Sequence, residues 1–494
     1  MMHEHGKSDR LIVPTKPPNE AEPGKAKEAV EGEGLAKGKV PERNVVRTQS
    51  RSAMSSALER IRQAARRDKG QRFTALLHHV YSVDTLKAAY FGLKRDAAAG
   101  MDGETWRQYG ERLESHLKEL SERIQRGAYR AQPVRRAYIG KAGEPGKVRP
   151  LGVLVVEDKI VQRATAEVLS SVYEQDFVRF SYGFRPGRSP HQALDALSIG
   201  IMRRKVNWVL DADIRGFFDN LDREWLVKFI EHRVNDQRIV RLIQKWLNAR
   251  VLEEGKHIDT EMGTIQGGSI SPLLANIYLH YVFDLWVKQW RKTKAQGDVI
   301  VVRFADDFVI GFEHRTDGER FLSELVERFK RFGLELHAQK TRLIEFGRNA
   351  EENRRNRGEG KPETFNFLGF THSCAKTRQG KFVVLRQTMR KRWQAKLKAV
   401  KAELRRRMHT PVPDMGRYVR GVVMGHMRYY AVPLNAVSVS DFRMAVVRIW
   451  RGVLKRRSQT AQLPWTQMRR YIARWVPQTR VCHPYPWQRF GVIT

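Results

Sequence analysis

Two adjacent carboxylates, Asp306 and Asp307, stand in the middle of an otherwise apolar stretch, residues 299–312. The flanking runs are rich in β-branched and aromatic residues, which predicts a β-hairpin with the acidic pair at its turn. Placing two charges beside so much apolar surface is costly unless a cation compensates them. From this stretch alone, an ordinary Asp-Asp surface turn is equally expected.

A second acidic segment, Trp-Val-Leu-Asp-Ala-Asp-Ile at residues 208–214, lies upstream. In a strand, alternation places Val209, Asp211 and Asp213 on one face. If Asp213 and Asp306 lie on neighbouring strands, their carboxylates can share two divalent ions about 3.5–4 Å apart. Hard oxygen ligands favour Mg2+. One ion would activate a 3′-hydroxyl and the other would stabilise departing pyrophosphate, so the two acidic strands predict a nucleotidyl transferase.

The overall charge indicates the kind of partner. The 494 residues include 91 Lys and Arg against 54 Asp and Glu, a net charge of +37, which favours binding to nucleic acid over a membrane surface. No apolar run approaches the roughly 20 residues that cross a bilayer, and the basic N-terminus does not resemble a signal peptide, so we expect a cytoplasmic protein without a membrane partner. Two cysteines, Cys374 and Cys482, exclude a disulfide scaffold and a four-cysteine zinc site.

Three segments occur in the order of the palm motifs of reverse transcriptases: Asp-Ile-Arg-Gly-Phe-Phe-Asp (213–219), Gly-Thr-Ile-Gln-Gly-Gly-Ser-Ile-Ser-Pro-Leu-Leu-Ala-Asn (263–276) and Phe-Ala-Asp-Asp (304–307). From about residue 55 onward, the chain resembles the reverse transcriptase/maturase proteins encoded in bacterial group II introns. The series of three is specific, whereas none is so alone. The resemblance implies an α+β right-hand polymerase fold: fingers and a palm with an antiparallel sheet and helices, then an α-helical thumb/maturase domain.

The resemblance also implies catalytic roles. Asp213, Asp306, Asp307 and the backbone of Ile214 would hold two Mg2+ ions, for which Mn2+ can substitute. Lys340 is a candidate general acid, because a protonated amine could donate to pyrophosphate as the P–O bond breaks. A plain surface lysine is equally expected at this position.

Four residues would contact the incoming nucleotide. Lys141 and Arg149, on a basic hairpin at residues 134–152, match residues that clasp its triphosphate, and Arg suits bidentate phosphate contact. Phe218 would be the steric gate that rejects a ribose 2′-hydroxyl, and Gln266 corresponds to a residue near the nucleotide and template. Without the resemblance, a solvated basic hairpin and a core aromatic would be the preferred interpretations.

Other basic residues are expected to bind nucleic acid. Arg185 and Arg188 match a turn that contacts the template backbone, although salt bridges at a rim would look the same. Residues 388–494 hold 23 Lys and Arg against 3 Asp and Glu. A helix there has an apolar stripe and a cationic face, which suits phosphate contact. Its candidate residues are Arg390, Lys391, Arg405, Arg406 and Arg407.

The predicted domains follow in order: a disordered basic leader (1–50), N-terminal extension helices (51–130), fingers (131–207), palm (208–387), thumb/maturase domain (388–453), and a short basic, aromatic DNA- or RNA-binding tail (454–494). The tail could equally be the end of the thumb. Unlike many relatives, the sequence has no cysteine-rich HNH endonuclease segment. Phe304 replaces a usual Tyr, and Ile265 replaces a usual Pro.

The resulting hypothesis is an RNA-directed DNA polymerase and maturase. It would bind its group II intron RNA, assist splicing, and copy the intron by target-primed reverse transcription during retrohoming, associating with the nucleoid when it acts on DNA. Its partners would be intron RNA, an RNA template with a DNA primer, target DNA and dNTPs; the oligomeric state is left open. Two alternatives are a domesticated reverse transcriptase in DNA repair or phage defence, and an RNA-binding splicing cofactor with an inactive palm.

Overall fold

A four-stranded antiparallel sheet of order β6-β7-β3-β8 lies at the centre of the computed structural model, which describes residues 56–140, 148–253, 256–258, 267–457 and 463–490. Its strands are β3 (Trp208–Ala212), β6 (Val299–Phe304), β7 (Asp307–Phe312) and β8 (Arg342–Glu345). Residues 299–312 thus form the predicted hairpin. The fold is mixed α and β, as expected.

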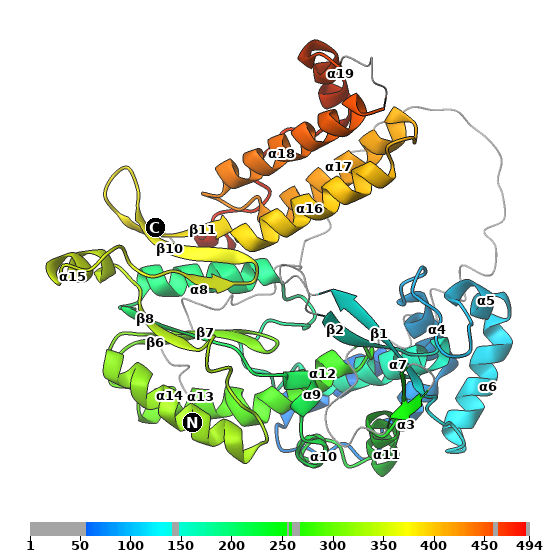
Figure 1. Cartoon of the computed structure of the whole chain (residues 1–494). Coiled ribbons are helices and arrows are strands. Elements are labelled where there is room, and N and C mark those ends of the chain that lie inside the picture. Colours follow the sequence, from blue (N-terminus) through cyan, green and yellow to red (C-terminus); the bar gives the residue numbers. More distant parts are fainter. Residues whose placement is uncertain (1–55, 141–147, 254–255, 259–266, 458–462, 491–494) are drawn as a thin grey trace, which may run out of the picture.

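The central sheet is buried on both faces because its strands are apolar at almost every position. Leu210 and Ile310 face one core, while Val209 and Val309 face another. The first core is covered by helices and the second by α8 (Pro190–Arg203) and a further sheet (Figure 1). The helices of the first core include α7 (Val156–Tyr173), α12 (Ser271–Leu279), the π-helix η1 (His280–Asp284), α13 (Leu285–Thr293) and α14 (Arg315–Arg331).

The N-terminal helices pack against α7. They comprise a helix at residues 56–67, α3 (Leu77–Tyr81), α4 (Val83–Phe91), α5 (Trp106–Glu111) and α6 (Leu113–Gln125). Helices α3 and α4 are separated at Ser82, which has an extended ψ of 125°. The predicted leader, residues 1–50, lies outside the described residues.

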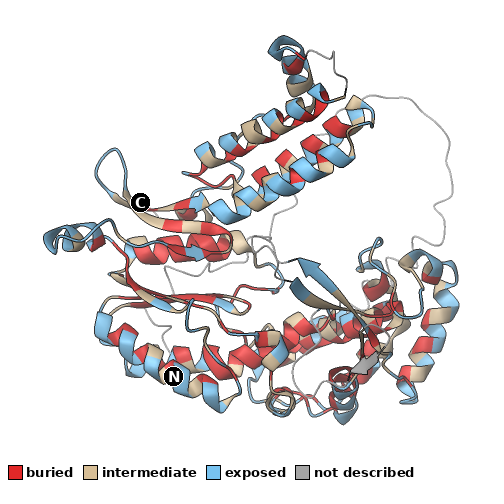
Figure 2. Cartoon of the chain, viewed as in Figure 1, coloured by how far each residue is buried: buried red, intermediate tan, exposed pale blue. Residues whose placement is uncertain are grey.

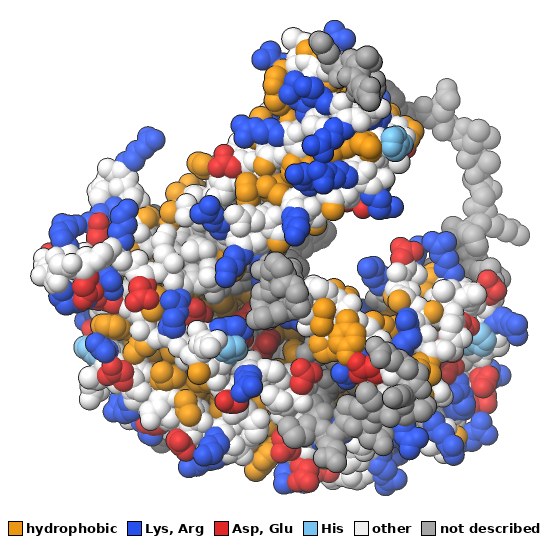
Figure 3. Space-filling view, in the orientation of Figure 1, with side chains coloured by type: hydrophobic (Ala, Val, Ile, Leu, Met, Phe, Trp, Pro, Cys, Tyr) orange, Lys and Arg blue, Asp and Glu red, His pale blue; other side chains and the backbone are white. Residues whose placement is uncertain are grey.

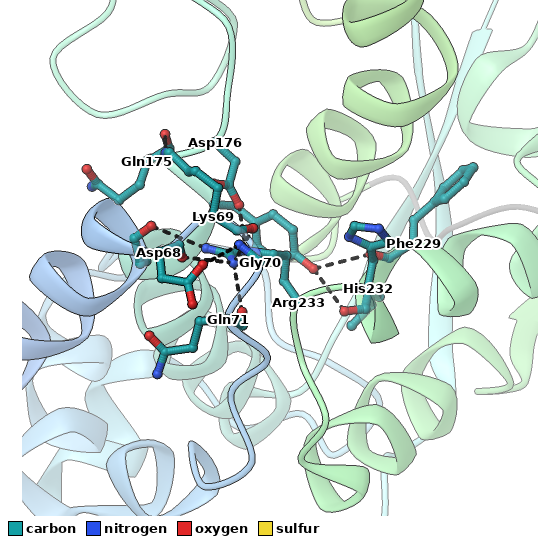
Figure 4. A network of polar contacts seen from close by, with 12 residues as sticks. Asp68, Lys69, Gly70, Gln71, Gln175, Asp176, Phe229, His232 and Arg233 are labelled. Atoms are coloured by element: carbon teal, nitrogen blue, oxygen red, sulfur yellow. Dashed lines mark hydrogen bonds and ion pairs between the residues drawn. The ribbon is translucent and has the colours of Figure 1, made fainter. Parts of the chain in front are cut away.

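Arg233 anchors the start of this N-terminal region from a position just after α10 (Arg223–Glu231) and before α11 (Gln237–Leu247) (Figure 4). Its guanidinium pairs with Asp176 at 2.8 Å and donates to the carbonyls of Lys69 and Gln71 at 2.6 and 2.7 Å. Buried carbonyls in a segment without regular structure need donors. A single arginine supplies them here.

The basic hairpin consists of β1 (Val134–Gly140) and β2 (Val148–Val153), which pair antiparallel. It is largely exposed, in contrast to the buried central sheet and α8 (Figure 2). The hairpin continues into β4 (Val251–Glu253) and β5 (Lys256–Ile258). The pairing of β1 with β4 is parallel, with Val134 opposite Val251, whereas the central sheet is antiparallel, as expected.

A third sheet, of order β11-β10-β9, covers α8 and leads into the C-terminal helices. Its strands are β9 (Phe365–Phe367), β10 (Phe370–Lys376) and β11 (Phe382–Thr388), with α15 (Ala350–Asn356) beside them. Four helices then form a separate core: α16 (Arg390–Arg406), α17 (Val412–Tyr430), α18 (Ala436–Lys455) and α19 (Trp465–Trp475).

The described part of residues 454–494 packs against the rest of the chain. Met468 of α19 is buried in the same core as Trp450 of α18. The short helix α20 (Pro486–Arg489) returns to α8, where Arg489 pairs with Asp195 at 2.6 Å. These contacts favour the second interpretation of the sequence, in which this segment completes the C-terminal helical region. In the described part of the chain, no helix is both long and apolar enough to cross a bilayer.

Candidate active site

Three aspartates meet at one end of the central sheet. β3 and β7 pair antiparallel with Ala212 opposite Phe308, so the next position along the ladder places Asp213 opposite Asp307. Asp306 lies in the turn that joins β6 to β7. Their charges interact with one another. The structure therefore brings together residues that are more than 90 positions apart in the sequence.

The environment of these aspartates opposes their negative charge. Burial, together with the charges of Asp306 and Asp213, raises the pKa of Asp307 to about 7. Burial likewise raises the pKa of Asp306, and it raises the pKa of Asp211 to about 6. Clustered carboxylates with raised pKa values are stabilised in their charged form by a nearby cation.

The donors fit Mg2+ in chemical type, since all are carboxylate oxygens. Among the described residues, no three acidic, His or Cys side chains form a close metal-ligand group. Instead, the ammonium of Lys340 lies 2.5 Å from Asp213 and supplies a positive charge there. Ile214 is buried beside Asp213 in a bridge with Leu336.

Backbone contacts place Lys340 at this position. The carbonyl of Asp213 accepts a hydrogen bond from the amide of His337 at 2.8 Å, and the amide of Lys340 donates to the carbonyl of His337 at 2.9 Å. The segment that carries Lys340 is therefore fixed against the end of β3. Its side chain is 44% exposed, so the ammonium has access to solvent as well as to Asp213.

A buried arginine, Arg303, supports the turn between β6 and β7 that carries Asp306. Its guanidinium donates to Asp284 at 2.7 and 2.5 Å, and both side chains are 0% exposed. The remaining donors reach Asn276 at 3.1 Å, Ser181 at 2.7 Å and the carbonyl of Ala305 at 2.9 Å. Ala305 directly precedes the acidic pair and has a φ of +58°, a left-handed conformation that is unfavourable for alanine. Arg303 therefore helps to hold a strained turn.

Gly183 packs against the same turn. A Cβ atom at this position would lie 2.2 Å from the amide nitrogen of Ala305, so only glycine allows the close approach. Asn276 donates to the Gly183 carbonyl at 2.8 Å and thus connects it to Arg303. Arg303 and Asp284 were not among the residues predicted from the sequence to belong to the site. A lone arginine in the run Val-Ile-Val-Val-Arg-Phe could have revealed them, because a buried charge requires a partner.

The nucleotide-binding candidates are placed only in part. Burial raises the pKa of Asp306 and of Asp219, and the charge of Arg149, which is exposed on β2, opposes this rise in both, so Arg149 faces the acidic cluster. Phe218 lies in the one-turn helix α9 (Phe217–Asn220), half-buried and edge-to-face with Phe217 at 5.2 Å. Lys141 and Gln266 lie outside the described residues.

The two substitutions at motif positions can be placed similarly. The half-buried ring of Phe304 lies 6.2 Å from that of Phe184, which is exposed. Ile265 lies outside the described residues.

Arg185 does not have the predicted exposure to a template. Its side chain is 5% exposed and pairs with Glu174 at 3.0 Å. It also donates to the carbonyls of Val178 and Ser181 at 2.7 and 2.8 Å. Its donors are therefore used within the protein, and the salt-bridge interpretation replaces the template contact. Arg188 is half-buried over the ring of Tyr182, at 5.3 Å.

The cationic residues of α16 fall into two groups. Arg390, Lys391 and Arg405 are exposed, as is Arg406, but no ion pair is found for the first three within the described residues. Arg406 and Arg407 pair with Glu403 at 2.7 and 2.5 Å. The apolar stripe of this helix faces the C-terminal core, as the sequence predicted.

Comparison with known proteins identifies the class of domain. Residues 139–372 match the model of the reverse transcriptase (RNA-dependent DNA polymerase) family, a range that contains the three aspartates, Lys340 and most of the central fold. The central sheet and the acidic cluster thus lie within the region that matches the reverse transcriptase family.

Two of the relatives below are named after introns, and the name of the third, YkfC, states no role. The chain is 37% identical over 226 residues to the group II intron-encoded protein LtrA of Lactococcus lactis subsp. cremoris, covering 45% of this chain and 37% of LtrA. It is 33% identical over 239 residues to protein YkfC of Escherichia coli K12, covering 43% of this chain and 62% of YkfC. An uncharacterized 91 kDa protein in a cob intron of Schizosaccharomyces pombe is 35% identical over 189 residues, covering 38% of this chain and 22% of that protein.

The chain is therefore related to the reverse transcriptase/maturase proteins of group II introns, and the resemblance drawn from its motifs is confirmed. The matched regions span only 37% of the length of LtrA.

Proposed function

We propose that this chain is an RNA-directed DNA polymerase that extends a DNA primer along an RNA template. The observation that carries this proposal is the meeting of Asp213, Asp306 and Asp307 at one end of the central sheet, within a reverse transcriptase domain. Two Mg2+ ions bound there would supply Lewis acidity for nucleotidyl transfer. The three carboxylates would hold these ions.

The surrounding residues have separate tasks. Lys340, already next to Asp213, would leave that carboxylate when metal binds and hold a proton near the departing pyrophosphate. Arg149 would bind the triphosphate, because it lies on the exposed hairpin that faces the cluster. The ring of Phe218 would limit space beside the sugar.

We also propose that the C-terminal helices grip nucleic acid and that the chain serves a group II intron, both in splicing and in copying the intron into target DNA. Lys and Arg side chains are spread among apolar ones over the visible face of these helices, and the molecule is hollowed between them and the N-terminal helices (Figure 3). Such a positive surface binds phosphates through counterion release. In this arrangement β1–β2 would act as fingers, the central sheet as palm, and α16–α19 as thumb.

The polymerase proposal is tested by primer extension on an RNA template with Mg2+ and dNTPs. Asp306→Ala should abolish extension because it removes a metal ligand, while binding to RNA should persist. Asp441→Ala, which removes an exposed carboxylate on α18, is the matched control and should extend normally. Equal loss of RNA binding in Asp306→Ala would instead assign a structural role to this carboxylate.

Extension by the wild type leaves the intron role to a splicing assay with the intron RNA that encodes the chain. Accelerated splicing supports the maturase role, whereas polymerase activity without any effect on splicing favours a domesticated reverse transcriptase. Splicing activity without extension would favour the RNA-binding cofactor.

A further inference from the structure

A pocket of about 500 Å3 lies among the C-terminal helices, away from the acidic cluster. Four arginines line it: Arg420 from α17, Arg443 from α18, and Arg469 and Arg474 from α19. Trp475, the last residue of α19, also contributes to its wall. Pockets of this size commonly hold small ligands or a short piece of a longer one.

The pocket is built by specific packing. A Cβ atom at Gly416 of α17 would lie 2.5 Å from the indole of Trp475, so glycine at this position lets α19 pack closely on α17. Arg443 donates to the carbonyl of Pro477 at 2.9 Å and so fixes the chain that follows α19. The walls are therefore held in place by contacts within the protein.

The charges around the pocket are not balanced. Among the residues that the structure describes, no Asp or Glu lines it, whereas Arg420, Arg469 and Arg474 are exposed in it. Only three acidic residues follow position 388 in the sequence, namely Glu403, Asp414 and Asp441. The first pairs with Arg406 and Arg407, the second pairs with Arg417, and the third does not line the pocket. An anion would therefore bind here with little competition from the protein's own carboxylates.

We propose that this pocket binds a phosphate of an unpaired nucleic-acid strand. Planar guanidinium groups bind phosphate oxygens in bidentate geometry, and three of them converge here from α17 and α19. A concave site favours one nucleotide of a flexible strand, whereas a duplex presents its phosphates along a broad convex surface. The proposal rests on the proposed function in one respect, because it takes nucleic acid as the partner.

The test uses the full chain and two variants of equal net charge. The pocket variant carries Arg420→Gln, Arg469→Gln and Arg474→Gln. The control variant carries Arg448→Gln, Arg470→Gln and Arg480→Gln, which removes three exposed arginines from the same region but outside the pocket. Binding to a short unpaired RNA is measured by fluorescence anisotropy over a series of salt concentrations.

We expect the pocket variant to bind about tenfold more weakly, and its plot of log affinity against log salt to be shallower by about 0.7, the contribution of one phosphate contact on a single strand. The control variant should change both quantities much less. Equal changes in the two variants would overturn the proposal, because they would reflect total charge alone. The single variants Arg469→Gln and Arg470→Gln repeat the comparison if a triple variant does not fold.

Further probes separate the sources of phosphate. If the pocket variant, but not the control variant, also bound unpaired DNA of the same sequence more weakly, the site would accept both RNA and DNA strands. If the pocket variant bound dATP more weakly but bound the unpaired RNA normally, the proposal would be overturned in favour of a free nucleotide. If the pocket variant lost as much affinity for a duplex as for the unpaired RNA, the preference for an unpaired strand would be overturned. Primer extension by the wild type is scored separately, so failure of the polymerase proposal does not decide this one.

Discussion

Replacing Arg303 with methionine tests how the fold supports the acidic turn. Methionine keeps an unbranched apolar stem but removes the guanidinium. The carboxylate of Asp284, which is 0% exposed, would then lose the two guanidinium donors that lie at 2.7 and 2.5 Å. Removing one partner of a buried ion pair typically costs about 3–5 kcal/mol. Burial already raises the pKa of Asp284 and Arg303 lowers it, so the isolated carboxyl should take up a proton and keep the cost near the lower value.

The same substitution should also slow nucleotide addition in the folded protein. The carbonyl of Ala305 would lose its donor at 2.9 Å, and the left-handed turn before Asp306 would lose part of its support. Displacements of about 1 Å at a reacting centre can cost about a hundredfold in rate. We therefore expect kcat for primer extension to fall by about 10- to 100-fold, measured in single-turnover reactions well below the unfolding midpoint.

Arg233→Met is the matched control. The ion pair between Arg233 and Asp176 is similarly buried: its atoms lie 2.8 Å apart, and the two side chains are 2% and 10% exposed, respectively. This pair, however, anchors the N-terminal segment (Figure 4). Urea unfolding should show a loss of about 3–5 kcal/mol here too, with no change in kcat. A second variant, Arg303→Met with Asp284→Leu, should recover stability but not rate. The reasoning would be refuted if Arg303→Met kept the wild-type kcat, or if both single variants slowed extension equally.

Two further predictions concern the sugar gate and acid stability. Phe218→Ala should raise the incorporation of ribonucleotides relative to deoxynucleotides, and unchanged sugar selectivity would remove this ring from the gate. Burial lowers the pKa of His280 and of His372 to about 3, from 6.5 in the unfolded chain. The unfolded state therefore binds more protons between these values, and stability should fall as pH drops below 6.5, by about 2 kcal/mol per histidine near pH 5. His372→Leu should flatten this dependence in urea titrations; an unaltered slope would contradict the assignment.

Features that depend on local periodicity could be predicted from the sequence. The alternation of Val209, Asp211 and Asp213, and the apolar runs around Asp306, indicated strands with carboxylates at their ends, because side chains alternate between faces in any strand. The apolar stripe of α16 was readable for the same reason, with a helical period. The order of the three motifs then indicated the reverse transcriptase domain.

The environment of each charged residue was decided only by the tertiary structure. Arg185 and Arg149 look alike in sequence, yet one is enclosed by Glu174 and backbone carbonyls and the other is exposed beside the acidic cluster. The parallel pairing of β1 with β4 and the pocket among α17, α18 and α19 likewise join segments that are distant in the chain.

The physical reason is that desolvation and charge pairing depend on everything that surrounds a group in space, whereas strand and helix periods depend on neighbours in the chain. The sequence by itself determined which carboxylates could perform nucleotidyl transfer. Only the folded chain decided that the pair of Arg303 and Asp284 supports the turn that carries these carboxylates. It also decided which arginines are exposed and can bind a phosphate.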